Sequence, residues 1–296
     1  MRYFFGYIWS KFLALSRTLT SHLSTLLLLL SLALTSCSSI RYAGVGRIRN
    51  YEIASAEVPP SFDGYRIGFV SDFHLKSKFK ERQLRGTVKA LQMLQPDVLM
   101  LGGDYQEGCE YVAPLFDELA KVTPRDGVYA VLGNNDYERC TDEIRATMQY
   151  HGIHLLEHAV DTLFRGNEYI VIWGANPYRG RYLTTRAAET NLIAEMLKPE
   201  DYVVMLTHTP DYVEEPDAYN ADLALAGHTH GGQVTLFGLY APVTASRYGM
   251  KFRSGLCESR HGYPVIISNG LGTSRRPIRM FAPTDVVVVT LRRLPQ

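Results

Sequence analysis

The stretch YRIGFVSDFHLKS, residues 65–77, decides the fold of this chain, because an apolar strand pattern ends in it and donor side chains follow at once. Short apolar runs of the same kind recur, and each leads into Gly, Asp, His or Asn. The runs are 65–70 before Asp72 and His74, 98–101 before Asp104, 128–132 before Asn134, 202–206 before His208, and 223–226 before His228 and His230. The chain therefore places its chemistry-bearing side chains where predicted strands end.

Helical periodicity separates the first of these strands from one another. Further strands are predicted at 169–173, 263–267 and 286–291, and helices at 79–95, 111–122, 141–150 and 185–197. Strands that alternate with helices indicate βαβ units, so periodicity by itself predicts an α/β fold. In such sheets ligands gather outside the carboxyl ends of the strands, which is where the polar clusters of this chain occur.

Composition points to an ordinary globular protein. The chain has 296 residues, of which 46% are hydrophobic and 21% charged, and its formal net charge is +1. One catalytic domain with a large core is the expectation at this length. The balanced charge gives no case for non-specific nucleic-acid binding or for a polybasic membrane arm, so the partner must be inferred from the site.

The first residues have the profile of a signal peptide. Basic residues precede an apolar stretch at 26–34, which is too short to span a bilayer. The residues that follow, LTSC at 34–37, resemble a bacterial lipoprotein cleavage box. We therefore expect a signal peptide at 1–36, a lipidated Cys37 with a tether at 37–60, and a domain at 61–296. The alternative is an uncleaved signal anchor with Cys37 incidental; both interpretations place the domain at a membrane.

Three further cysteines, Cys109, Cys140 and Cys257, cannot form a complete set of disulfides because their number is odd. We expect three buried thiols, since cysteine is among the most buried residue types. A single Cys109–Cys140 bridge is the alternative.

Five clusters carry candidate metal ligands. They are DFH at 72–74, GGD at 102–104, GNND at 133–136, TH at 207–208 and GHTH at 227–230. Imidazole, carboxylate and amide oxygen suit divalent first-row metals, and Mn, Fe, Zn, Co and Ni all fit this set. A dinuclear site also needs one carboxylate that bridges the two ions.

The order and residue types of these clusters resemble the calcineurin-like metallophosphoesterase superfamily over residues 63–292. GHTHGGQ at 227–233 and SNGLGTSRRPIR at 268–279 are similar to its membrane-associated bacterial branch, which includes the YkuE and YaeI phosphodiesterases. The resemblance implies a four-layer fold, in which two mixed β-sheets pack face to face with helices outside. The metals would lie at one edge of the sheets.

The resemblance also implies roles for individual residues. Asp72, His74 and His230 would bind a first divalent metal ion. Asn134, His208 and His228 would bind a second. Asp104 would bridge the two ions, and a metal-bridging hydroxide would attack phosphorus, with Asp104, Asn134 and His228 as the residues closest to the chemistry. Asp136 and Asp222 are candidates for carboxylates that orient the imidazoles, with a solvated or capping role as the alternative for Asp222.

Asn135 departs from the family pattern, which commonly has a general-acid histidine there. Asparagine cannot donate a proton at neutral pH, so poor leaving groups should suffer most. This favours activated diesters or pyrophosphates over simple alkyl monoesters. Histidines elsewhere are candidates for the missing acid, although core or surface positions are the simpler expectation: His151, His154, His158 and His261.

Substrate contacts are harder to place. Arg275 and Arg276, with Arg279, follow a glycine-rich stretch and are candidates for binding a second phosphate, against the alternative of a solvated basic face. Asn135 is a further candidate substrate contact. An aromatic and basic cluster at 178–182 is equally compatible with a substrate cover and with an exposed loop.

The leading hypothesis is a membrane-associated, metal-dependent phosphodiesterase or pyrophosphatase acting on a lipid-linked or nucleotide-like substrate. We expect a lipoprotein facing the periplasm or the exterior, with a signal-anchored inner-membrane protein as the alternative. A narrower version is a UDP-2,3-diacylglucosamine-type pyrophosphatase of lipid A synthesis, a step that belongs to the cytoplasmic face. From another class, a catalytically decayed lipoprotein binding module is motivated only by Asn135.

Overall fold

A computed structural model of the chain describes residues 44–175, 193, 196–216 and 218–295. Contacts divide the chain into the units Met1–Arg41 and Tyr42–Gln296, and every described residue belongs to the second. The expected signal peptide and Cys37 lie outside the described residues. Within the described part of the chain, no helix has the length and apolar character that crossing a membrane requires.

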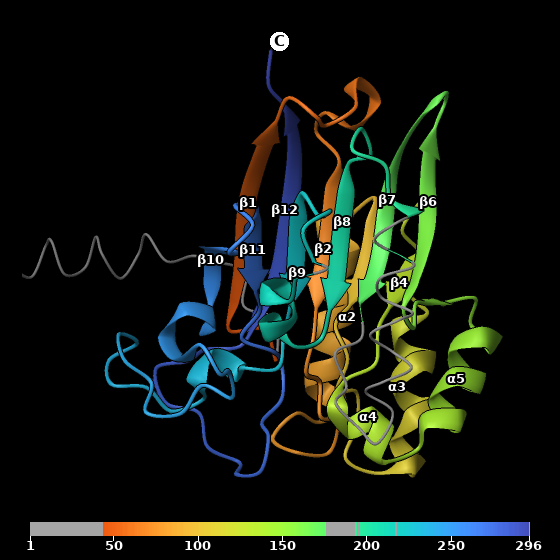
Figure 1. Ribbon diagram of the computed structural model, residues 1–296. Helices are drawn as coiled ribbons and strands as arrows, with labels where there is room; N and C mark the ends of the chain where they lie inside the picture. The colour runs from red at the N-terminus through yellow and green to blue at the C-terminus, as the bar shows by residue number, and fades with distance from the viewer. Residues whose placement is uncertain (1–43, 176–192, 194–195, 217, 296) are drawn as a thin grey trace, which may run out of the picture. The chain divides into compact units, whose positions relative to one another are not determined.

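Two six-stranded sheets form the centre of the unit (Figure 1). The first contains β1 (Arg47–Ser55), β2 (Arg66–Val70), β3 (Val98–Leu101), β4 (Val128–Ala130), β5 (His154–Leu155) and β12 (Asp285–Arg293). Its order is β1-β12-β2-β3-β4-β5, and only the β12–β2 pair is antiparallel. The sheet is therefore mixed, as the family resemblance implies.

The second sheet is mixed as well. It contains β6 (Ala159–Arg165), β7 (Glu168–Ala175), β8 (Val203–Thr207), β9 (Leu223–Ala226), β10 (Gly255–Glu258) and β11 (Pro264–Ile267). Its order is β10-β11-β9-β8-β7-β6, with antiparallel pairs at the two ends and parallel pairs in the middle. The central strands of both sheets are nearly continuous apolar runs, as expected for strands buried on both faces.

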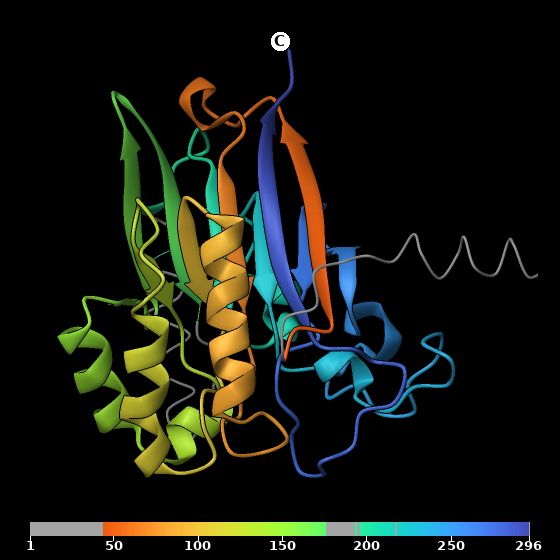
Figure 2. The same cartoon turned by 180° about the vertical axis from the view of Figure 1, so that it is seen from behind.

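Helices cover the outer face of the first sheet (Figure 2). They are α2 (Glu81–Leu94), α3 (Val112–Leu119) and α5 (Thr141–Tyr150), while the short α4 (Asn134–Glu138) follows β4. Leu84, Val88 and Leu91 are buried at helical spacing on α2, which explains why this helix packs on the sheet. The 3₁₀ helices are η1 (Pro60–Phe62), η2 (Cys109–Tyr111), η3 (Pro210–Glu214), η4 (His230–Gly232) and η5 (Gly249–Phe252).

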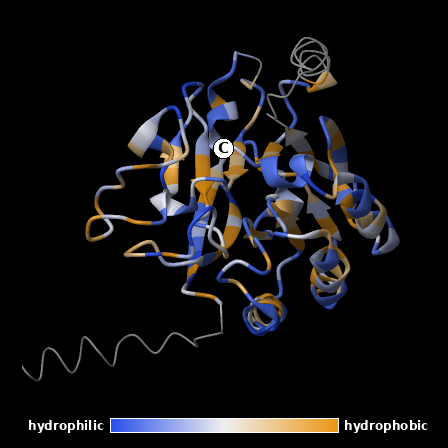
Figure 3. Cartoon of the chain, turned by 90° about the horizontal axis from the view of Figure 1, so that it is seen from below, coloured by the Kyte–Doolittle hydropathy of each residue, from blue (hydrophilic) through white to orange (hydrophobic). Residues whose placement is uncertain are grey.

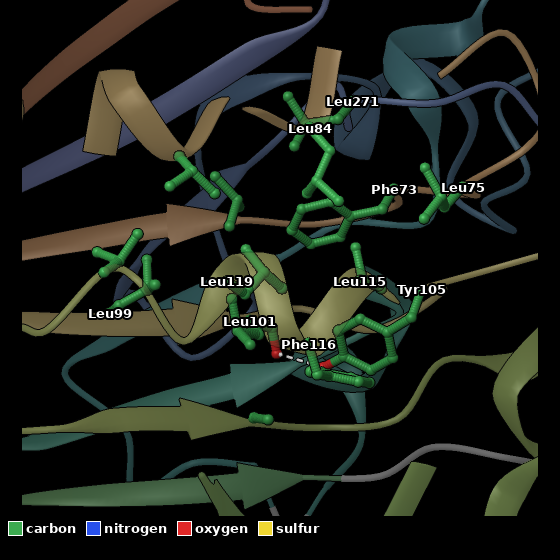
Figure 4. Packing of buried hydrophobic residues seen from close by; sticks show 14 of the residues in the cluster. Phe73, Leu75, Leu84, Leu99, Leu101, Tyr105, Leu115, Phe116, Leu119 and Leu271 are labelled. Carbon is green, nitrogen blue, oxygen red and sulfur yellow. Dashed lines mark hydrogen bonds between the residues drawn. The ribbon is translucent and has the colours of Figure 1, made fainter. Parts of the chain in front are cut away.

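Three hydrophobic clusters form the core of the unit. One lies between the sheets and joins residues such as Phe69 of β2 to Leu225 of β9. A second lies under the helices, where Leu84 and Phe116 pack with Phe73 (Figure 4). A third covers the outer face of the second sheet and includes Trp173. The unit therefore has the independent core that a domain needs to fold alone. The predicted helix at 185–197 falls largely outside the described residues.

Strand β1 corrects the expected tether at 37–60 and the domain start at 61. Its nine residues pair in register with β12, from Arg47 with Asp285 to Ser55 with Arg293. Its sequence, RIRNYEIAS, is largely polar because β1 is an edge strand with only Ile53 fully buried. A strand that buries so little apolar surface has no clear period-2 pattern.

A disulfide joins Cys109 and Cys140, so the expectation of three buried thiols is wrong. The bridge forms because η2 leads into α3 and Cys140 precedes α5, and these two helices pack against each other. Their Cα atoms are 5.5 Å apart, although 31 positions separate them in the chain. Cys257 is a free, half-buried thiol.

Candidate metal centre

The predicted donor residues converge at one edge of the two sheets. In Figure 1 the arrowheads of β2 and β8 both point to the lower edge, where the loops gather. Asp72 and His74 follow β2, and Asp104 follows β3. His208 and His228 follow β8 and β9 of the second sheet. Because parallel strands present their carboxyl ends together, residues far apart in sequence meet here.

Two groups of donors form. Asp72, His74 and His230 make one, and each offers a ligand atom within 4.8 Å of the others. Asp104, His208 and His228 make the other, to the same distance. All six residues are buried or half-buried. Asn134 belongs with the second group, because its Oδ1 lies 3.3 Å from Nε2 of His208.

Asp104 lies between the two groups. Its Oδ2 is 3.4 Å from Nε2 of His74 and 3.5 Å from Nε2 of His208. One carboxylate thus faces an imidazole of each group, which is the arrangement that a bridging ligand requires. The backbone N–H of Asn135 donates to Oδ1 of Asp104 at 3.0 Å, so the carboxylate is held from its other side.

Five of the donor residues have a left-handed backbone. The φ angles of Asp72, His74, Asp104, His228 and His230 lie between 41° and 68°. This conformation is uncommon for residues with a side chain, and it persists where surrounding contacts over-determine it. Here the N–H of His228 donates to both carboxylate oxygens of Asp72, at 3.1 and 3.0 Å. The strained loops are therefore locked to one another across the sheets.

Gly227 and Gly103 permit this close approach. A Cβ at Gly227 would overlap the side chains of Ser71 and Asp72. Gly103 has a φ of 87°, and a Cβ there would overlap the backbone of Gly133. Gly227 thus lets a loop of the second sheet approach the loop after β2, and Gly103 lets two loops of the first sheet approach each other.

Fixed partners orient the imidazoles. Nδ1 of His74 is 2.7 Å from Oε1 of Glu107, and Nδ1 of His208 is 2.7 Å from the carbonyl oxygen of Gly102. Both contacts leave Nε2 turned towards Asp104, as second-sphere partners of metal-binding histidines do. Sequence reasoning missed Glu107. Its position three residues after Asp104 is the only signal in the sequence, and that spacing is uninformative because residues 104–107 form no helix.

The electrostatics of the centre favour added positive charge. Burial lowers the pKa of His74, but the carboxylates of Asp104 and Glu107 outweigh it and raise this pKa to about 10. Burial likewise lowers the pKa of His208, and Asp104 raises it to about 9. Burial raises the pKa of Asp104, yet His208 and His74 hold it well below its ordinary value. The carboxylates thus create a negative, buried pocket.

The donor set fits divalent metal ions. Nε2 of His74 is buried and has no hydrogen-bond partner among the described residues, although it faces Asp104. Such an atom is costly unless a ligand satisfies it. Mixed imidazole and carboxylate donors in a negative pocket are what first-row divalent metals bind. Metal would also take the place of the protons that His74 and His208 otherwise attract, whereas burial lowers the pKa of His228 and His230.

Asn135 lies at the centre, and Asp136 supports it from behind. Nδ2 of Asn135 is 3.2 Å from Nδ1 of His74. The buried carboxylate of Asp136 accepts the N–H groups of Asp104, Tyr105 and Gly133, at 2.7 to 3.0 Å. Asp136 therefore positions the backbone around Asp104 and does not contact an imidazole through these bonds.

Asp222 does not serve the centre. Its carboxylate accepts the N–H of Val203 at the beginning of β8, the end opposite the donor loops.

Three of the histidines proposed as the missing general acid are bonded to other groups: the ring of His151 to Asp117, that of His154 to Asp161, and that of His261 to the carbonyl oxygen of Glu215. His158 precedes β6 and has a φ of 51°.

The three predicted arginines separate into two kinds. Arg279 is structural: its guanidinium donates to the carbonyl oxygens of Gly272 and His230, at 2.6 and 3.2 Å. Burial lowers its pKa to about 10. Arg275 and Arg276 are exposed. The cluster at 178–182 lies outside the described residues.

Comparisons with known proteins agree with this geometry. Residues 65–232 match the family model of calcineurin-like phosphoesterases. An uncharacterized metallophosphoesterase of Aquifex aeolicus is 31% identical over 254 residues, covering 83% of this chain and 92% of that protein. The uncharacterized metallophosphoesterase YkuE of Bacillus subtilis is 26% identical and covers 82% of this chain and 84% of its own length.

A relative from Danio rerio is named a transmembrane protein with metallophosphoesterase domain. It is 24% identical and covers 91% of this chain and 63% of its own length. Family match, donor geometry and sequence identity agree. The chain therefore belongs to the calcineurin-like phosphoesterase family, and it is a metal-dependent phosphoester hydrolase.

Proposed function

We propose that the protein is a two-metal phosphodiesterase or pyrophosphatase that acts on a lipid-linked or nucleotide-like substrate at a membrane. The position of Asp104 carries the two-metal proposal, because its carboxylate faces His74 of one donor group and His208 of the other. Asp72, His74 and His230 would hold one ion, and Asn134, His208 and His228 the other. Bound there, divalent ions polarise phosphoryl oxygens and make a water acidic enough to supply a nucleophile near neutral pH.

The residues of the chain position this chemistry. Glu107 and Gly102 fix the imidazole rings, and the locked loops hold the carboxylates without reorganisation during reaction. The Asn135 amide lies beside His74, at the chain position where the family resemblance implies a general acid. A leaving group that needs little protonation, such as a nucleotide or a phosphate, suits this arrangement.

An exported location is supported by the disulfide between Cys109 and Cys140. Disulfides persist in the periplasm and outside the cell and are rare in the cytosol. The bridge therefore favours a lipoprotein attached through Cys37 over an inward-facing anchored protein. It also counts against the step of lipid A synthesis, which belongs to the cytoplasmic face. Mass spectrometry of the native N-terminus would detect the lipid.

The decayed binding module has little support. The six histidine and aspartate donors are present and converge, whereas a decayed site is expected to lose some of them. Purified protein that binds no metal would revive this alternative.

The test uses metal-stripped protein and three substrates: bis-p-nitrophenyl phosphate, p-nitrophenyl phosphate and UDP-2,3-diacylglucosamine. Hydrolysis is measured with and without manganese, beside Asp104→Asn. We expect turnover of a diester or pyrophosphate that requires both metal and Asp104. Turnover that survives Asp104→Asn would contradict the two-metal site, and a preference for the monoester would contradict the substrate class.

A further inference from the structure

Two loops beside the metal centre carry exposed apolar side chains. The first loop, residues 233–243, follows η4, and the second, residues 274–281, lies between β11 and β12. We call the following side chains the apolar rim: Leu236, Phe237, Leu239, Val243, Met280 and Phe281. Leu239 is 80% exposed and Phe237 73% exposed. Figure 3, which views the edge of the sheets where the centre lies, shows hydrophobic colour on the projecting loops. Exposed apolar side chains that gather on neighbouring loops indicate an interaction site.

The two loops form one built surface. Val234 and Met280 form a β-bridge, and the rings of Phe237 and Phe281 are 5.4 Å apart. The side chain of Gln233 donates to the carbonyl oxygens of Ser274 and Arg276, at 3.2 and 2.9 Å. Backbone and side-chain bonds thus hold the apolar rim in one shape.

The apolar rim is also tied to the metal centre. His230 is three residues before Gln233, so the first loop begins at a predicted metal ligand. Arg279, in the second loop, donates to the carbonyl oxygen of His230 at 3.2 Å and approaches its Nδ1 at the same distance. Whatever binds the apolar rim is therefore held near the site of hydrolysis.

The loops that carry the apolar rim contain no acidic residue, although Arg247 and Lys251, farther along the chain, pair with Asp211 and Glu214. The segments 233–257 and 263–284 contain no Asp or Glu. Arg275 and Arg276 are exposed on the second loop, next to the apolar side chains. Arginines beside exposed aromatic and aliphatic side chains match an interface with acyl chains below and anionic headgroups above.

The described chain begins at the same edge. The hydroxyl of Thr284 donates to the carbonyl oxygen of Gly44 at 2.8 Å, and Thr284 closes the segment that contains the second loop. With the expected signal peptide at 1–36, only residues 37–43 would lie between it and Gly44. Seven residues reach about 25 Å at full extension. An N-terminal lipid or anchor would therefore hold this edge, and not the opposite one, within reach of a bilayer.

We propose that the apolar rim inserts into an anionic lipid bilayer and holds the metal centre at its surface. This inference deepens the proposed function, since the membrane side of that function rests on the N-terminal region, whereas the apolar rim belongs to the folded unit. A lipid-linked substrate could then reach the centre without leaving the membrane.

The test measures co-sedimentation of the unit Tyr42–Gln296 with vesicles of phosphatidylglycerol and phosphatidylethanolamine, and with vesicles of phosphatidylcholine alone. Phe237→Ser is compared with Phe164→Ser, because Phe164 is 69% exposed and its ring is 5.8 Å from that of Tyr169. Phe164 is the penultimate residue of β6 and lies at the edge opposite the metal centre. Each variant is first shown to melt at the temperature of the unaltered unit.

We expect binding to the anionic vesicles, weakened about tenfold by Phe237→Ser and unchanged by Phe164→Ser. Arg275→Gln with Arg276→Gln should remove most of the preference for anionic over phosphatidylcholine vesicles. Equal binding by the two phenylalanine variants, or no binding by the unaltered unit, would overturn the proposal. So would a dimer in sedimentation velocity that Phe237→Ser dissociates, because a second copy would then cover the apolar rim. Hydrolysis of soluble bis-p-nitrophenyl phosphate is measured separately and tests the proposed function without vesicles.

Discussion

Single side chains around the donors decide how the centre works. His74 has its Nδ1 on Glu107 and its Nε2 towards Asp104, so Glu107 sets the direction in which the imidazole offers its lone pair. Asn135 touches the same ring from another side. These two contacts lead to separate predictions, one for metal affinity and one for the choice of substrate.

Glu107→Gln should weaken metal binding by about 10- to 100-fold, because the neutral amide holds the His74 ring less firmly and lowers its basicity. Isothermal titration with manganese measures this. Glu110→Gln is the matched control, since Glu110 lies three residues later, in η2, and its ion pair is with the exposed Lys76. Equal affinities in the two variants would show that Glu107 does not orient the ligand.

Asn135→His should raise hydrolysis of esters with poor leaving groups by roughly 100-fold or more, because it restores a proton donor. Diesters with good leaving groups should change little. The ratio of alkyl monoesterase to bis-p-nitrophenyl phosphate hydrolysis measures the effect, with Asn135→Ala as control. An unchanged ratio would mean that Asn135 does not occupy the position of the leaving-group acid.

At the scale of elements, the loops and helices around the centre are held by contacts distant in sequence. The Cys109–Cys140 bridge joins the beginning of α3 to that of α5, on the side of the first sheet that carries Asp104 and Asn134. At the other end of the strands, Asp222 joins the beginning of β9 to that of β8. Each contact stabilises the strands that present the donors.

Replacing both bridged cysteines, Cys109→Ser with Cys140→Ser, should lower the free energy of unfolding by about 2–4 kcal/mol. The loss arises because the unfolded chain has more conformational entropy without the bridge, which stabilises the unfolded state. Urea unfolding of the unit Tyr42–Gln296 measures this loss. Cys257→Ser, at a free thiol, serves as control. If the double variant unfolds at the same urea concentration as the unaltered unit, the bridge does not stabilise the fold.

Asp222→Asn should change how stability depends on pH. Burial raises the pKa of Asp222 to about 7, the Val203 N–H opposes this, and Glu57 adds to it. The folded state therefore binds the proton more tightly than the unfolded state. This stabilises the protein at low pH and is lost as pH rises towards about 7. The melting temperature of Asp222→Asn minus that of the unaltered protein should thus increase between pH 4 and pH 7. A melting-temperature difference that does not change with pH would contradict the raised pKa of Asp222.

At the scale of the whole molecule, the metal centre joins the two sheets. Its donors follow β2, β3 and β4 in the first sheet and β8 and β9 in the second. The cluster between the sheets holds the same strands together away from the centre. Metal binding therefore needs the folded unit, because the unfolded chain does not bring these donors together.

Removing metal with a chelator should lower the melting temperature, and manganese should restore it. A ligand that binds only the folded state at about 100 times its Kd contributes about 2.7 kcal/mol. Differential scanning fluorimetry with and without manganese measures the change. Asp104→Asn should show a much smaller manganese effect. If the melting temperature does not change on chelation, and elemental analysis verifies that the metal is lost, a site shared between the sheets is contradicted.

Much of the fold was predictable from local pattern. The buried strands β2, β3, β8 and β9 are short apolar runs that end in donors, so their type and carboxyl ends could be read directly. The edge strands β1, β6 and β10 were missed, because strands that bury one face or less lack such a run. The same limit applies to β5, which has only two residues.

The sequence by itself determined which chemistry the chain carries, because the residue types of the donors, their order and their positions after apolar runs need no tertiary contact to be recognised. Only the tertiary structure decided that Asp104 faces both donor groups, that Glu107 orients His74, and that Cys109 meets Cys140. It also showed that Asp222 lies away from the centre and that the side chains of the apolar rim lie beside it. Periodicity reports which face of one element is buried. Which elements meet depends on how two sheets twist and pack, and no local pattern records that.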